Sequence, residues 1–138
     1  MKPAEALSDL TEISTQIEAA VIFDKSGEVA GSTVSDDQRA QRMARSALAL
    51  LNAAESQGEG ELAQLEVALR DGSVFVVRHD DRAIAATTRS QPTVGLVFYD
   101  LKSCLRRLAE QPEAPKKRRA PAKKPTTTRA RTRKKADT

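Results

Sequence analysis

Apolar side chains recur at steps of three and four residues between positions 36 and 56, and this period predicts a long central helix. Asp36 and Asp37 stand at its start, where a carboxylate can accept hydrogen bonds from free backbone N–H groups. Gly58 and Gly60 are expected to end it. The stripe consists of Ala40, Met43, Ala44, Ala47, Leu48, Leu51 and Ala54.

The apolar character of this helix is not confined to one stripe. Leu50, Ala49 and Ala53 continue it round the helix from Leu51, where a helix covered on one side would carry charge. Two explanations remain open: the helix packs on its own sheet and on a second copy of the chain, or its alanines only reflect a high helix propensity. The first predicts a self-association face that includes Met43, Ala47, Leu50, Leu51 and Ala54.

The segments before this helix predict a helix and a hairpin. Residues 3–14 carry leucines and an isoleucine at three-residue steps after Pro3, which suits a first helical turn. Residues 19–23 and 28–32 are strand-like, and a turn of sequence Asp24-Lys25-Ser26-Gly27 separates them. A short connection of this kind joins antiparallel strands.

Three strands and a helix are predicted after position 60. Residues 65–70 alternate between apolar and polar, Asp71-Gly72 is a strong hairpin signal, and residues 74–77 form an apolar run expected to be covered on both faces. Residues 84–88 give the last strand. Pro92 opens a final helix that Pro112 closes. Its apolar positions are Val94, Val97, Phe98, Leu101, Leu105 and Leu108.

The predicted order is therefore helix, two strands, helix, three strands, helix. Because tight turns join the strands within each group, the five-stranded sheet is expected to be antiparallel. Helices on both faces would make a three-layer α/β/α domain of the α+β class. The sequence has no tryptophan, so its large core aromatics are expected to be Phe23, Phe75, Phe98 and Tyr99.

Charge divides the 138-residue chain into a folded domain, expected over 3–111, and a tail over 112–138. Residues 1–112 hold 12 basic and 17 acidic residues, whereas residues 113–138 hold 11 basic and 2 acidic ones. A proline-containing segment without large apolar residues cannot build a core, so we expect the tail to be disordered when free. Its basic residues are Lys116, Lys117, Arg118, Arg119, Lys123, Lys124, Arg129, Arg131, Arg133, Lys134 and Lys135.

The tail charges predict binding to anions. Phosphates of nucleic acid would be held by counterion release, and an anionic membrane surface would attract the same charges. An acidic protein face, the acidic domain of this chain, or a purely solubilising role are further alternatives. No aromatic residue interleaves the tail cations, so base stacking by the tail is not expected.

Candidates for catalysis are few. His79, the only histidine, stands beside Asp80 and Asp81 in a predicted turn, where three adjacent side chains rarely converge on one point. Cys104 is the only cysteine and is expected to be a small core residue. Gly58-Glu59-Gly60 lacks the Gly-Lys-Ser/Thr of a phosphate loop. We therefore expect neither enzyme activity nor a cofactor or metal.

The location follows from the same composition. A single cysteine makes no internal disulfide, which suits a reducing compartment. Glu5 and Asp9 interrupt the N-terminal segment, so no signal peptide is expected. No stretch approaches the ~20 apolar residues of a membrane span. A cytoplasmic protein is the expectation.

The segment from Pro3 to Leu108 resembles the bacterial members of the Roadblock (dynein light chain 7) family. The resemblance is diffuse, and Glu18-Ala19 stands where many relatives carry a glycine. The residues that carry it are Leu7 and Leu10, Ala20-Val21-Ile22-Phe23-Asp24 with Gly27, Leu65-Glu66-Val67-Ala68-Leu69, Val74-Phe75-Val76-Val77-Arg78, and Pro92-Thr93-Val94-Gly95-Leu96-Val97.

This resemblance implies a profilin-like arrangement and a homodimer formed through the central helix and the third strand. That strand adds Leu65, Val67 and Leu69 to the predicted self-association face. It also implies a regulator or scaffold that binds a small Ras-like GTPase and carries no nucleotide itself. The basic tail is no part of the family pattern.

Three functions therefore stand as hypotheses. The first is a homodimeric, non-enzymatic module that binds a small GTPase or a related signalling assembly. The second is a nucleic-acid-associated protein in which dimerisation doubles the basic tail and raises its avidity. The third is a small-molecule sensor, which the scarcity of polar core groups disfavours.

Overall fold

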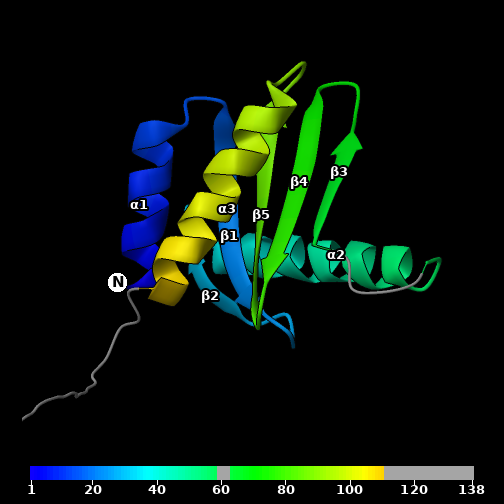
Figure 1. Cartoon of the computed structure of the whole chain (residues 1–138), viewed down its shortest axis with the longest axis horizontal. Coiled ribbons are helices and arrows are strands. Elements are labelled where there is room, and N and C mark those ends of the chain that lie inside the picture. The colour runs from blue at the N-terminus through cyan, green and yellow to red at the C-terminus, as the bar shows by residue number, and fades with distance from the viewer. Residues whose placement is uncertain (59–62, 111–138) are drawn as a thin grey trace, which may run out of the picture.

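The computed structural model describes residues 1–58 and 63–110 (Figure 1). Its helices and strands follow the predicted order and type. They are α1 (Pro3–Ile13), β1 (Ile17–Asp24), β2 (Val29–Ser32), α2 (Asp37–Glu55), β3 (Gln64–Ala68), β4 (Gly72–His79), β5 (Arg82–Arg89) and α3 (Val94–Glu110).

The five strands form one antiparallel sheet in the order β2-β1-β5-β4-β3. β5 is the middle strand, and β2 and β3 are the edge strands of the sheet. The apolar run in β4 lies between β5 and β3. Phe75 and Val77 belong to a hydrophobic core on one face of the sheet, and Val76 belongs to a second core on the other face. The prediction that both faces of this run are covered is confirmed for these three residues, whereas Val74 is only partly buried.

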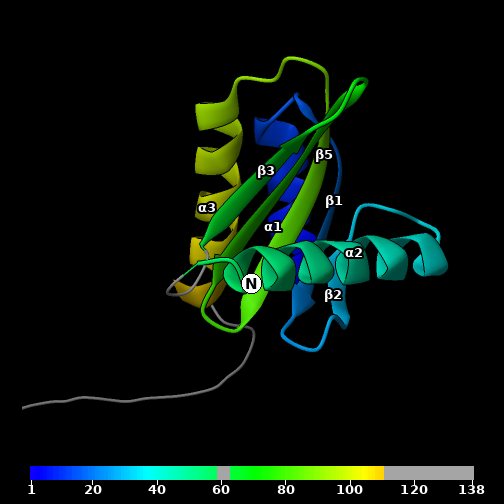
Figure 2. The ribbon, with the colours of Figure 1, turned by 90° about the vertical axis from the view of Figure 1, so that its right-hand side faces the viewer.

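Helices cover both faces of the sheet, which confirms the three-layer architecture. α1 and α3 lie side by side on one face (Figure 1), whereas α2 lies on the other and runs across the strands (Figure 2). The core under α1 and α3 contains Leu7, Leu10, Ile22, Ile84 and Leu101. The core under α2 contains Val21, Phe23, Ala44, Leu51 and Ala85.

Specific contacts hold α3 in place. The Cys104 thiol donates a hydrogen bond of 3.7 Å to the carbonyl oxygen of Ala6 in α1. Phe98 meets Phe75 of β4 edge to face, with 5.0 Å between ring centroids, a favourable geometry for aromatic pairs. α3 is therefore fixed both to α1 and to the sheet.

The start of α2 follows the prediction. Asp36 is the N-cap, and its Oδ1 accepts hydrogen bonds from the backbone N–H groups of Gln38 and Arg39. The Gln41 amide donates to the carbonyl oxygen of Gly27 at 2.8 Å and so joins α2 to the β1–β2 turn. The helix ends at Glu55, three residues before Gly58, whereas Gly60, the other glycine expected to end it, lies outside the described residues.

Tyr99 corrects the predicted core. Its side chain is 64% exposed, because at 100° per residue it lies opposite the buried stripe of Val97, Leu101 and Cys104 on α3. Val94 is also exposed. None of the described helices is long and apolar enough to cross a membrane.

Candidate interface on α2 and β3

β3 is an edge strand, and its position defines the candidate site. It pairs with β4 on one side and with no strand of the described chain on the other. An open edge presents a row of backbone N–H and C=O groups that can pair with another chain. Natural proteins usually cover or charge such an edge, so this one calls for an explanation.

The side chains of β3 alternate between the two faces of the sheet. Leu65 lies opposite Val76 and Val67 opposite Val74, so both face the layer of α2 and are half-buried. Leu69, just beyond the strand, is 60% exposed. The open edge is therefore accompanied by apolar side chains on the α2 side.

α2 contributes a second set of side chains, and the structure separates them. Ala47 and Leu51 are 2% and 0% exposed and belong to the core of their own protomer. They are thus not available to a partner, unlike Met43, Leu50 and Ala54, which keep accessible surface. We name as the α2–β3 surface Met43, Leu50, Ala54, Leu65, Val67 and Leu69.

An ion pair fixes the end of α2 over the sheet. Glu55, the last residue of α2, pairs with Arg78 of β4, and both side chains are largely buried. α2 is therefore joined to β4, the strand that pairs with β3.

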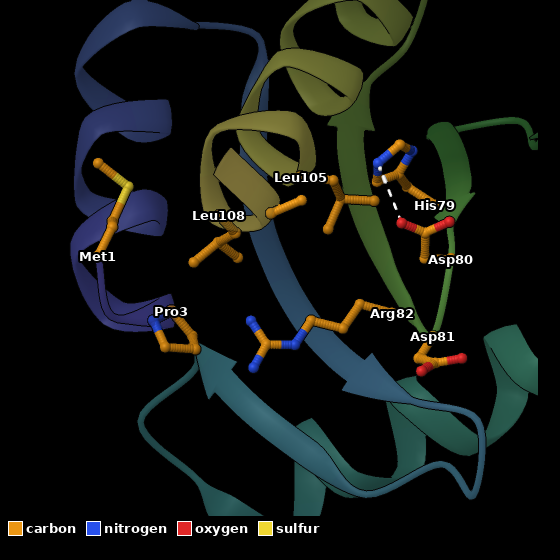
Figure 3. Close-up of a pocket in the computed structure, with 9 residues that line it drawn as sticks. Met1, Pro3, His79, Asp80, Asp81, Arg82, Leu105 and Leu108 are labelled. Atoms are coloured by element: carbon orange, nitrogen blue, oxygen red, sulfur yellow. Dashed lines mark ion pairs between the residues drawn. The ribbon is translucent and has the colours of Figure 1, made fainter. Parts of the chain in front are cut away.

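The turn between β4 and β5 holds the predicted histidine cluster and lines a pocket of about 240 Å³ (Figure 3). Nε2 of His79 lies 3.5 Å from Oδ2 of Asp80, whereas the carboxylate of Asp81 pairs with Lys25 at 3.3 Å. The three side chains thus do not converge. Arg82 extends toward Pro3 at the far wall (Figure 3).

Other candidate chemistry is equally sparse in residues 1–58 and 63–110. No group of three or more His, Cys, Asp or Glu side chains is placed to hold a metal ion within this part of the chain. Cys104 is fully buried, and burial raises the pKa of its thiol to about 11. The thiol is therefore protonated and inaccessible at neutral pH. All the predicted anion-binding residues of the tail lie outside the described residues.

One feature of α3 was not predicted. Lys102 and Arg106 stand on its outer face, close to the end of β4, and Tyr99 lies on the same side of the helix. The heptad-like apolar pattern indicates which side of α3 is buried, but only the packing brings the opposite side next to β4.

Sequence comparisons give no relatives: no family model and no curated protein matches the chain. Solved structures do match it. A Roadblock/LC7 domain from Streptomyces avermitilis superimposes with a TM-score of 0.73 at 19% identity, covering 80% of this chain and 97% of that one. Myxococcus xanthus MglB gives 0.63 at 17% identity, with coverages of 78% and 85%.

Profilin shares the architecture more distantly. The profilin of Schizosaccharomyces pombe superimposes with a TM-score of 0.57 at 13% identity, covering 80% of this chain and 98% of that one. The class of protein is thus the profilin-like α/β/α sandwich. Within that class the chain has the Roadblock/LC7 fold, as the resemblance in its sequence implied.

Proposed function

We propose that this protein is a homodimeric, non-enzymatic regulatory module of the cytoplasm that binds a small Ras-like GTPase or a related signalling complex. The observation that carries the proposal is the outer edge of β3, which pairs with no strand of residues 1–58 and 63–110, with Leu69 exposed beside it and the accessible Leu50 on α2. A surface of this kind is satisfied by a second copy of itself.

A two-fold axis beside β3 would satisfy both parts of the surface together. β3 would pair with its copy and continue the sheet across the dimer, as in strand addition at a sheet edge. The apolar residues of the α2–β3 surface would meet their counterparts, because a two-fold interface places the same patch on both subunits. A solved MglB structure with a tetrameric arrangement supports self-association for this fold.

The GTPase partner is supported by the fold and by the arrangement of polar groups. The resemblance to bacterial Roadblock domains implies a partner among the small Ras-like GTPases, and the chain shares the fold of these domains. The described residues bring no nucleophile, base and orienting group together. A binding module that shifts the nucleotide cycle of its partner fits these observations better than an enzyme.

Self-association is tested by sedimentation of the full chain at high micromolar concentration. We expect a dimer for the natural sequence and a monomer for the double variant Leu50→Glu/Leu69→Glu, because four carboxylates would face one another in the dimer. Ile13→Glu is the matched control: Ile13 is 62% exposed, against 60% for Leu69, but lies at the end of α1 on the other face. A monomeric natural sequence would refute the proposal.

The partner is tested with purified small GTPases from the same genome, loaded with GDP or a GTP analogue. We expect one of them to be retained by the immobilised natural protein and its nucleotide exchange or hydrolysis rate to change. The Leu50→Glu/Leu69→Glu variant should lose this effect if the dimer forms the binding surface. If no GTPase is retained in either nucleotide state, the regulatory proposal fails while the dimer can stand.

The tail favours a second function, phosphate binding. Its 11 basic residues among 26 would bind nucleic acid with little sequence preference and a steep dependence on salt. We expect removal of residues 113–138 to abolish such binding and to leave the GTPase interaction intact. The reverse result would assign the tail to the protein partner.

A further inference from the structure

A hollow of about 250 Å³ lies between the carboxyl end of β4 and the outer face of α3. Its lining is basic: Arg78, His79, Lys102 and Arg106 surround it together with Ala63 and Val77, and no carboxylate of residues 1–58 and 63–110 lines it. Such a lining favours an anionic ligand, since like charges in a recess concentrate counterions.

Lys102 and Arg106 are the cations that can turn to a ligand. They are exposed, and four residues separate them, which places them on one face of α3. Within residues 1–58 and 63–110 neither forms an ion pair, although Glu66 lies on the same side of the sheet. Arg78 differs, because it pairs with Glu55.

Tyr99 extends this surface along the helix. It precedes Lys102 by three residues and therefore shares its face, and its ring is 64% exposed. Tyr99 and Arg106 are separated by roughly 10 Å along the helix axis at 1.5 Å per residue. An exposed ring followed by two cations is the combination that binds single-stranded nucleic acid, by base stacking and by phosphate contacts.

We name the hollow and the adjoining outer face of α3, with Tyr99, Lys102 and Arg106, the α3–β4 groove. We propose that it binds a single-stranded nucleic acid, with Tyr99 stacking on a base and Lys102 and Arg106 contacting its phosphates. The groove lies at the root of the basic tail, because α3 ends at Glu110 and the 11 tail cations follow from position 116.

The neighbouring helix α1 argues against an anionic membrane as the ligand. α1 lies beside α3 (Figure 1) and exposes Glu5 and Glu12, which a flat anionic surface would meet together with α3. A single strand is narrow enough to follow the outer face of α3 along Tyr99, Lys102 and Arg106 without covering α1. This inference does not depend on the GTPase proposal, and it adds a folded site to the phosphate-binding role proposed for the tail.

Tyr99 supplies a probe of the groove, because it is the only tyrosine in the chain. The full chain labelled with 3-fluorotyrosine has one fluorine resonance, which reports the groove and not the tail. We expect titration with an unlabelled oligothymidylate to shift this resonance. The tail alone, however tightly it binds, would leave it in place.

Binding is then measured against salt with a fluorescent oligothymidylate. For Lys102→Ala/Arg106→Ala we expect the slope of log K against log salt to fall by about 1.4, because a single strand contributes about 0.7 per phosphate contact. Between 50 and 200 mM salt this amounts to a roughly sevenfold smaller loss of affinity. Arg70→Ala/Arg89→Ala is the control, since it removes two exposed cations at the opposite end of the sheet.

Tyr99→Ala should weaken binding while leaving the salt slope unchanged, since stacking releases no counterion. The proposal is overturned if the oligonucleotide binds without moving the fluorine resonance, or if both double variants change the slope equally. It is also overturned if vesicles of phosphatidylcholine and phosphatidylserine shift the resonance and the oligonucleotide does not. Circular dichroism of each variant verifies the fold.

Discussion

The carboxylate of Glu55 pairs with the guanidinium of Arg78 and so joins the last residue of α2 to β4. The side chains are 23% and 17% exposed, which reduces the screening by water that weakens surface pairs. The pair adds to the core packing of α2 a polar contact with β4, the strand that pairs with β3. We therefore expect it to stabilise the fold and to help hold the end of α2 near the α2–β3 surface.

Arg78→Ala should lower the free energy of unfolding by about 1–2 kcal/mol, between the values typical of exposed and of buried charged hydrogen bonds. Urea denaturation measures the change. Glu55→Ala and the double variant complete a cycle, and a positive coupling energy is expected. Strictly additive losses would show that the pair contributes nothing. Weaker dimerisation of Arg78→Ala would link the pair to the surface.

Two glycines should respond oppositely to alanine. A Cβ at Gly72 would lie 2.1 Å from the carbonyl oxygen of Thr88 in β5, so Gly72→Ala must push the strands apart and cost about 1–3 kcal/mol. A Cβ at Gly95 in α3 would meet nothing within 4 Å beyond its chain neighbours and the backbone of its own helix, so Gly95→Ala should gain roughly 0.5–1 kcal/mol of helix stability. Thermal unfolding of both variants tests the contrast, and an unchanged Tm for Gly72→Ala would contradict it.

The N-cap of α2 gives a third test. Asp36→Ala removes the acceptor for the Gln38 and Arg39 N–H groups, at 3.0 and 3.4 Å, and should cost about 1 kcal/mol. Asp36→Asn keeps an acceptor and should retain most of that energy. Asp37→Ala is the control, because Asp37 lies inside the first turn and contributes only through the helix dipole. Equal losses from Asp36→Ala and Asp37→Ala would exclude capping.

Cys104 predicts a dependence on alkaline pH. Burial raises the pKa of the folded thiol to about 11 from an ordinary 9.0. Because the folded pKa is the higher one, the thiol's contribution is complete below pH 9 and is lost as the pH rises toward 11. The stability advantage of the natural protein over Cys104→Ala should therefore shrink between about pH 9 and about pH 11. A constant difference in urea denaturation would contradict the buried thiol.

Much of the fold follows from local pattern. The change of apolar period from three or four to two separates helices from strands, and Asp36, Asp71-Gly72 and Pro92 mark boundaries that the structure retains within a few residues. These signals are local, because a cap or a turn involves only neighbouring backbone groups. The uneven charge distribution likewise comes from composition alone.

The accessibility of the residues in the candidate sites depends on packing between distant segments of the chain. Periodicity places Ala47, Leu50 and Leu51 around α2, but only the angle at which α2 crosses the sheet decides that Ala47 and Leu51 are buried and Leu50 is accessible. Tyr99 differs, because its aromatic character suggested the core whereas its angular position on α3, which the helical period already fixes, places it opposite the buried stripe.

By itself the sequence determined the order of elements, the antiparallel pairing within each strand group and the basic tail, because each depends on residues close together in the chain. Tertiary structure alone decided that β3 is an edge, that Glu55 meets Arg78, and that Lys102 and Arg106 flank the end of β4. Strand order and helix docking are set by the burial of apolar surface over the whole domain, and no local stretch encodes that sum.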